Sequence, residues 1–154
     1  MATTIVPSDL IVTITESYSL NGVDYGNTMN KTYTSNGQVS QRVMSIAGKA
    51  EGTTWTDILA LTTVDGQGQV VKTDYKYFRI TNLDTVNTLN LRVYNGADYV
   101  VFEVSPASSL LLMDAGIDAT TVSSAVTFAD IQAIAGQSSS ATEAIDVEFV
   151  MVTA

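Results

Sequence analysis

Short runs in which apolar and polar residues alternate recur along the chain, separated by residues that favour turns. Alternation with a period of two is the pattern of a strand that buries one face, so we expect an all-β protein. Val, Ile and Thr make up 49 of the 154 residues, which fits strands and argues against long helices. The clearest predicted strands are Leu10–Thr15, Gln38–Ile46, Ile58–Val64, Tyr75–Asn82, Thr88–Tyr94, Val100–Val104, Ser109–Met113 and Ile145–Val152.

The hairpin that follows Thr88–Tyr94 has a predictable register. A four-residue loop, Asn95 to Asp98, pairs Val93 with Val100, whereas a two-residue loop would place Asp98 on the core face. Burying an unpaired carboxylate is costly, so the longer loop is expected. Ser109–Met113, with three leucines at its centre, is predicted to be a fully buried strand.

Other segments are predicted by their turn residues. Two Asn-Gly pairs, Asn21-Gly22 and Asn36-Gly37, are typical of tight turns. The polar segment between them, Val23–Thr34, is expected to be an edge strand or a long loop. Thr127–Gly136 fits a helical stripe and a strand equally well.

A glycine-rich loop, Asp65-Gly66-Gln67-Gly68, is expected to separate the N-terminal strands from the main body of the protein. We expect a jelly-roll-like antiparallel β-sandwich of about eight strands, with its core formed by residues 75–154. Residues 1–74 are expected to form an N-terminal arm, hairpin or extra β-layer, either as a separate unit or as part of the same domain.

The absence of two residue types limits the chemistry. The chain has neither Cys nor His, which excludes disulfides, a Ser-His-Asp triad and the usual zinc centres. No phosphate-binding glycine motif occurs, so neither a cofactor nor enzymatic activity is expected. Two alternatives stay open: a calcium site near Asn82 and Asp84, and a glycosidase using carboxylates such as Asp146 and Glu148.

The charge is acidic and uneven. The net charge is −9, and residues 93–154 hold eight acids and no base, so binding to nucleic acid is not expected. No apolar run approaches the length of a membrane helix, and no membrane association is expected. The start, Met1 to Pro7, lacks the features of a secretory signal, so the protein is expected to be made in a cytoplasm.

Several outward-facing side chains are apolar, aromatic or basic, and we expect another subunit to cover them. This predicted interface consists of Tyr75, Tyr77, Arg79, Arg92, Tyr94, Tyr99, Val101, Val150 and Val152. Trp55 lies in a polar run, and we expect it either to cap one end of the core or, if the protein binds glycans instead, to stack on a sugar.

Three stretches, Tyr77–Asp84, Leu89–Val93 and Phe102–Leu112, resemble small jelly-roll proteins of tailed-phage virions, and Ala144–Val150 resembles their closing strand. Ala107 stands where those proteins usually have Gly after the proline, which leaves the turn type open. The resemblance implies a capsid decoration or cement protein, often trimeric, without catalytic residues. Its partners would be its own copies and the major capsid protein or other virion proteins, and its location the virion.

Overall fold

The computed structural model describes residues 8–49, 55–62, 70–113 and 130–154, and β-strands are the main secondary structure of these residues. The chain divides into two compact units. The residues up to Gln38, with Ala154, form the first, and residues 39–153 form the second. We call these units the arm and the sandwich.

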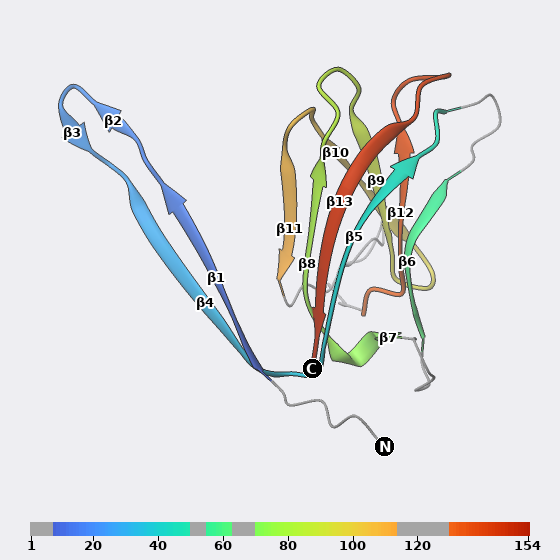
Figure 1. Ribbon diagram of the computed structural model, residues 1–154, viewed down its shortest axis with the longest axis horizontal. Coiled ribbons are helices and arrows are strands. Elements are labelled where there is room, and N and C mark those ends of the chain that lie inside the picture. The colour runs from blue at the N-terminus through green and yellow to red at the C-terminus, as the bar shows by residue number, and fades with distance from the viewer. Residues whose placement is uncertain (1–7, 50–54, 63–69, 114–129) are drawn as a thin grey trace, which may run out of the picture. The chain divides into compact units, whose positions relative to one another are not determined.

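The arm is a twisted antiparallel ribbon, drawn in blue in Figure 1. Its strands are β1 (Ser8–Glu16), β2 (Ser19–Leu20), β3 (Val23–Asp24) and β4 (Asn27–Asn36), with β1 paired to β4 and β2 to β3. Asn21 and Gly22 close the tip with φ angles of 52° and 79°. Two positive φ angles define a type I′ turn, which confirms the predicted turn.

One face of the arm is more apolar than the other. Leu10, Val12 and Ile14 are half-buried and alternate with exposed residues, as their spacing predicts. Leu10 lies opposite Tyr33, and Ile14 lies opposite Met29. Tyr33 is buried, but Leu10, Val12 and Ile14 remain partly exposed, because a two-stranded ribbon has no second layer of its own to cover the whole face.

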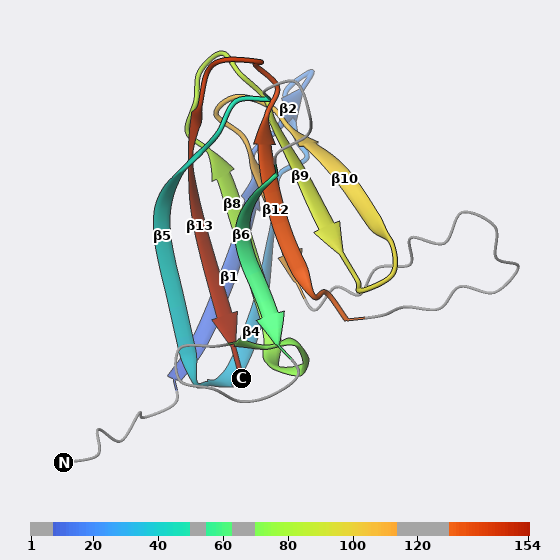
Figure 2. The same ribbon diagram turned by 90° about the vertical axis from the view of Figure 1, so that its right-hand side faces the viewer.

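The sandwich consists of two sheets, whose strands are visible in Figure 1 and, turned by 90°, in Figure 2. One sheet has the order β11-β8-β13-β5, and the other has the order β10-β9-β12-β6-β7. A short 3₁₀ helix, Lys72–Asp74, precedes β8. The strands are β5 (Gln38–Ile46), β6 (Thr56–Thr62), β7 (Val70–Val71), β8 (Tyr75–Asn82), β9 (Leu89–Tyr94), β10 (Tyr99–Val104), β11 (Ser109–Met113), β12 (Ala133–Ser138) and β13 (Ile145–Thr153).

Strands that lie side by side in the sandwich form nested pairs along the chain. Apart from the two-residue β7, the first described strand of the sandwich adjoins the last, the second adjoins the second last, and so on inward. The resulting neighbours are β5 with β13, β6 with β12, β8 with β11, and β9 with β10. This wrapping gives two Greek keys in two sheets, which is the jelly roll. The predicted fold class is therefore confirmed.

The core lies between the two sheets. Leu89, Leu91 and Val93 are buried on β9 and alternate with half-buried residues. Apolar residues of β13 alternate in the same way, and its Phe149 ring stacks 6.1 Å from the ring of Phe78 on β8. The alternation places one apolar set per strand in the core.

The β9–β10 hairpin has the predicted register, with Val93 opposite Val100. The side-chain oxygen of Asn95 accepts hydrogen bonds from the N–H groups of Ala97 and Asp98 at 3.1 and 2.8 Å, which holds the four-residue loop. Asp98 thus stays in the turn and away from the core.

The turn after β10 has a left-handed residue that is not glycine. Ala107 has a φ of 54°, and the N–H of Ser108 donates to the carbonyl of Ser105 at 3.2 Å. With Pro106 at the second position and a positive φ at the third, this is a type II turn. The resemblance left this turn type open.

The structure places the boundary between the two units at Gln38, rather than at residue 74. β5 and β6 precede residue 74 but lie beside β13 and β12, and their Ile46 and Ile58 belong to the core. A local pattern predicts a strand but does not reveal its distant partner, which explains the different boundary. The Asp65–Gly68 loop and the start of Thr127–Gly136 lie outside the described residues.

Two further predictions need correction, and one open alternative is resolved. β11 is the edge strand of its sheet, and only Leu112 is buried, so it is not a fully buried strand. Gly37 alone separates β4 from β5, which belong to different sheets, so Asn36-Gly37 does not close a hairpin. For Thr127–Gly136, where the sequence left helix and strand open, the residues from Ala133 onward belong to the strand β12.

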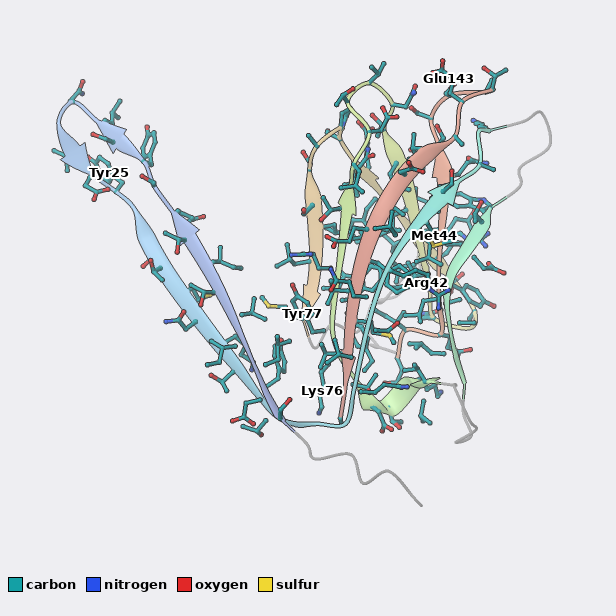
Figure 3. All side chains as sticks on the ribbon, in the orientation of Figure 1. Tyr25, Arg42, Met44, Lys76, Tyr77 and Glu143 are labelled. Atoms are coloured by element: carbon teal, nitrogen blue, oxygen red, sulfur yellow. The ribbon has the colours of Figure 1, made fainter. Side chains whose placement is uncertain are left out.

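Tyr75 was expected to face outward, but it belongs to the core cluster. Val152 lies opposite Tyr77 while the next residue, Thr153, lies opposite Tyr75, so Lys76 (Figure 3) is an extra residue in the β8 ladder. One extra residue reverses the side to which the preceding side chain points. The Tyr75 hydroxyl donates to the carbonyl of Leu112 at 2.7 Å.

Candidate functional site

The outer face of the β10-β9-β12 sheet brings together residues that the sequence proposes for two different functions. The Arg92 guanidinium lies 4.8 Å from the centre of the Trp55 ring and 5.9 Å from that of Tyr99. Trp55 was the candidate for sugar stacking, whereas Arg92 and Tyr99 were assigned to the subunit interface. The structure makes them one cluster.

Two members of this cluster, Arg92 and Tyr99, also line a hollow of about 180 Å³, together with Tyr94, Ala133 and Ala135. We call it the Arg92 hollow. Strand register explains its shape. Arg92 lies beside Ala135 on β12, and Tyr94 lies beside Ala133, so two small side chains form the low part between large ones. The Tyr94 hydroxyl donates to the carbonyl of Gly96 at 2.5 Å, which fixes that ring.

Arg92 is half-buried, and within the described ranges it has neither an ion pair nor a hydrogen-bond acceptor. The two aromatic rings therefore provide its protein contacts by cation–π attraction. Its N–H donors are left for water or for a ligand.

The outer face of the other sheet carries a polar cluster. Arg79 Nη2 donates to Glu148 Oε2 at 2.8 Å, and Gln41 Nε2 donates to Glu148 Oε1 at 2.6 Å. Both oxygens of this carboxylate therefore have partners, while Asp146 on the same strand is exposed. These two carboxylates were the pair of the glycosidase alternative, and one of them is held in a hydrogen-bonded cluster.

The predicted interface residues differ widely in exposure. Tyr99 and Val101 are 60% and 47% exposed, so they offer real surface to a partner. Arg79, Arg92, Tyr94 and Val150 are half-buried. Tyr75, Tyr77 and Val152 are buried and offer little surface. Burial raises the pKa of the Tyr77 hydroxyl, and the nearby positive charge of Arg79 opposes this shift.

Asn82 and Asp84, the residues of the calcium alternative, are engaged in shaping the loop before β9. The buried Asn82 side chain donates to the carbonyls of Asn87 and Val104 at 2.9 and 3.1 Å. The Asp84 carboxylate accepts hydrogen bonds from the N–H groups of Val86 and Asn87 at 2.7 and 2.6 Å. The Asn87 and Val86 hydrogen bonds lower the pKa of the Asp84 carboxyl.

The opposite side of the same loop contacts Glu143, which accepts a hydrogen bond from Asn87 Nδ2 at 3.0 Å. Figure 3 shows Glu143 at this end of the sandwich. Within the ranges that the structure describes, no group of three or more acidic side chains is arranged to hold a metal ion.

The sequence prediction missed one class of exposed residue. In the described part of the arm, six large apolar side chains are exposed, as are Val39 and Val43 on β5. Tyr25 lies near the tip of the arm (Figure 3). The arm set is Ile11, Tyr18, Leu20, Val23, Tyr25 and Met29. Their apolar character was visible in the sequence, but their exposure depends on how many layers cover a strand.

Comparisons with protein-family models, with curated proteins and with solved structures find no match to this chain. Among the residues placed by the structure, no helix is long and apolar enough to cross a membrane. The sites themselves are therefore the basis for assigning a function.

Proposed function

We propose that the chain is a non-enzymatic structural subunit of a phage virion, most simply a decoration or cement protein that works by adhesion. Its partners would be its own copies, in a homotrimer, and the major capsid protein or other virion proteins. The resemblance of residues 75–154 and the jelly-roll fold support this proposal. A subunit that assembles by adhesion needs exposed surface that it can bury against a partner, and it needs no catalytic group.

The observation that carries the proposal is the arm. Its described residues form a two-stranded ribbon with an apolar stripe and six exposed large apolar side chains, and they include no second layer. Both outer edges of a two-stranded ribbon also keep the capacity to pair with another strand. We propose that a second copy of the chain covers this face.

The test is the mass of the full chain in solution, measured by light scattering after size-exclusion chromatography over a wide concentration range. We expect a trimer near three times 16.4 kDa. Monomer at every concentration would contradict self-association.

A matched pair of arm variants locates the contact. Ile14→Asp places a charge on the half-buried stripe, opposite Met29. Thr15→Asp places the same charge on the next, exposed residue. We expect the first to weaken association by about tenfold or more and the second to leave it unchanged. Equal effects would mean that the stripe is not the contact.

A further inference from the structure

The Arg92 hollow has the character of a small ligand site. Its arginine is half-buried, close to two rings, and without a carboxylate or carbonyl partner among the described residues. The Arg92 nitrogens are not among the buried side-chain atoms that lack a partner, so the N–H groups of the guanidinium reach solvent and can meet a ligand there. Here the rings orient the guanidinium and leave its hydrogen-bonding capacity unused by the protein.

A guanidinium presents N–H groups in a fixed plane, and this arrangement matches the two oxygens of a carboxylate. Arg92 is also the last base in the sequence, since residues 93–154 carry eight acids and no base. The net charge of the chain is −9, which opposes the approach of a long polyanion more than that of a ligand with a single carboxylate.

The remaining lining favours a sugar. Tyr99 is 60% exposed and offers a ring face on which the C–H face of a pyranose can stack. Ala133 and Ala135 leave the hollow open between Arg92 and Tyr94. A volume of about 180 Å³ equals roughly six water molecules at ~30 Å³ each, which is the size of one monosaccharide unit.

We propose that the Arg92 hollow binds a single carboxylate-bearing sugar unit of the uronic acid type. Arg92 pairs with the carboxylate, and Tyr99 stacks on the sugar ring. Trp55 is a positioning residue, which acts by holding the guanidinium. This site is independent of adhesion by the arm.

The test is a titration of the full chain, followed by NMR, with three probes: methyl glucuronide, methyl glucoside and acetate. The first has both the ring and the charge, and each of the others has only one. We expect the glucuronide to bind in the millimolar range, at least about tenfold more tightly than either of the others. The proposal would be overturned if the glucuronide bound no more tightly than methyl glucoside, or no more tightly than acetate.

Two variants and a control assign the site. Arg92→Lys keeps the charge but loses the planar fork, and we expect about tenfold weaker glucuronide binding. Arg92→Gln should remove the preference for glucuronide over glucoside. Arg42, on β5, also lies over an aromatic ring, 5.8 Å from the centre of Phe149, so Arg42→Gln is a matched control that should bind as the native chain does.

The same samples keep this proposal separate from adhesion. Light scattering on each variant reports the oligomeric state, which Arg92→Gln should leave unchanged because the proposed contact is the arm and not the interface predicted from the sequence at Arg92. Thermal unfolding shows whether the variant is folded, and Arg92→Lys provides a second reading if Arg92→Gln is not. Preference for glucuronide that persists in both variants would overturn the role of Arg92, whatever the oligomeric state.

Discussion

The arm and the sandwich are built from the same kind of residue pattern and differ in what covers it. In the sandwich, Phe78 and Ile80 are fully buried between two sheets. In the arm, Leu10, Val12 and Ile14 follow an equally regular alternation but are only half-buried. Alternation therefore reports which residues share a face, and the number of layers decides whether that face is covered.

This difference separates two kinds of stability. Burial of apolar surface contributes about 25 cal/mol per Å², so the sandwich gains most of its stability from its own core. The arm has backbone pairing and a tight turn, with much less burial. Substitutions of the same kind should therefore have different effects in the two units.

The largest contrast is expected for aromatic side chains. Phe149→Ala should lower the free energy of unfolding by about 3–5 kcal/mol, because it empties a packed position in the core. Tyr25→Ala, at an exposed position in the arm, should change it by about 0.5 kcal/mol or less in the dissociated chain. Urea unfolding followed by circular dichroism measures both. A comparable loss from Tyr25→Ala would mean that the arm's apolar residues are covered within one chain.

Polar side chains should show the same contrast on a smaller scale. Asn82→Ala removes three hydrogen bonds of a fully buried amide, including the one its oxygen accepts from the N–H of Asp84, and leaves the Val104 carbonyl without that partner. We expect a loss of about 2 kcal/mol. Thr13→Ala removes an exposed hydrogen bond of 2.8 Å to Asn30 in the arm, and urea unfolding should show almost no change. Similar losses would contradict the view that burial sets the cost.

Two turns that contain a residue with a positive φ allow one stabilising and one destabilising substitution. Ala107→Gly should stabilise the sandwich by about 1 kcal/mol or less, since glycine adopts a φ of 54° without strain. Gly22→Ala meets no atom within 4 Å, so its cost of about 1 kcal/mol comes from backbone strain alone. It should speed amide hydrogen exchange in β1 and β4, while the sandwich amides exchange as before. Faster exchange in both units would show that they unfold together.

The smallest effect concerns pH. The folded-state pKa of Asp84 is lowered below its ordinary value of 3.8, so the ionised form stabilises the folded loop at neutral pH. This contribution is lost as the pH falls through the lowered pKa. The native chain should therefore lose more stability on acidification than Asp84→Asn. Asp24→Asn, in the arm, is the control and should follow the native curve for the sandwich. Identical curves for all three would contradict a role for Asp84.

Much of the sandwich could be predicted from its sequence, because its determinants are local. The Asn95–Asp98 loop followed from the cost of burying one carboxylate, and the faces of β9 and β13 followed from alternation. Tyr75 could not be predicted, because the bulge at Lys76 depends on how β8 pairs with β13.

The Arg92 hollow could not be predicted from the sequence for the same reason. Trp55, Arg92 and Tyr99 were each recognised as unusual in the sequence. Their meeting on one face depends on pairing between strands that are distant along the chain. The alanines of β12 gave no signal, because a small residue forms a hollow only when its neighbours are known.

The nested order of the strands also has a consequence for the time course of folding. The arm joins residues that are close in sequence, such as Thr13 and Asn30, which are 17 positions apart. Gln41 on β5 and Glu148 on β13 meet across 107 positions. Closing long loops is slow, and a chain emerging from the ribosome cannot pair β5 with β13 until β13 has been made. The arm, with its apolar stripe, is therefore expected to exist for a period in which the sandwich does not, and neighbouring nascent chains would meet through their arms first.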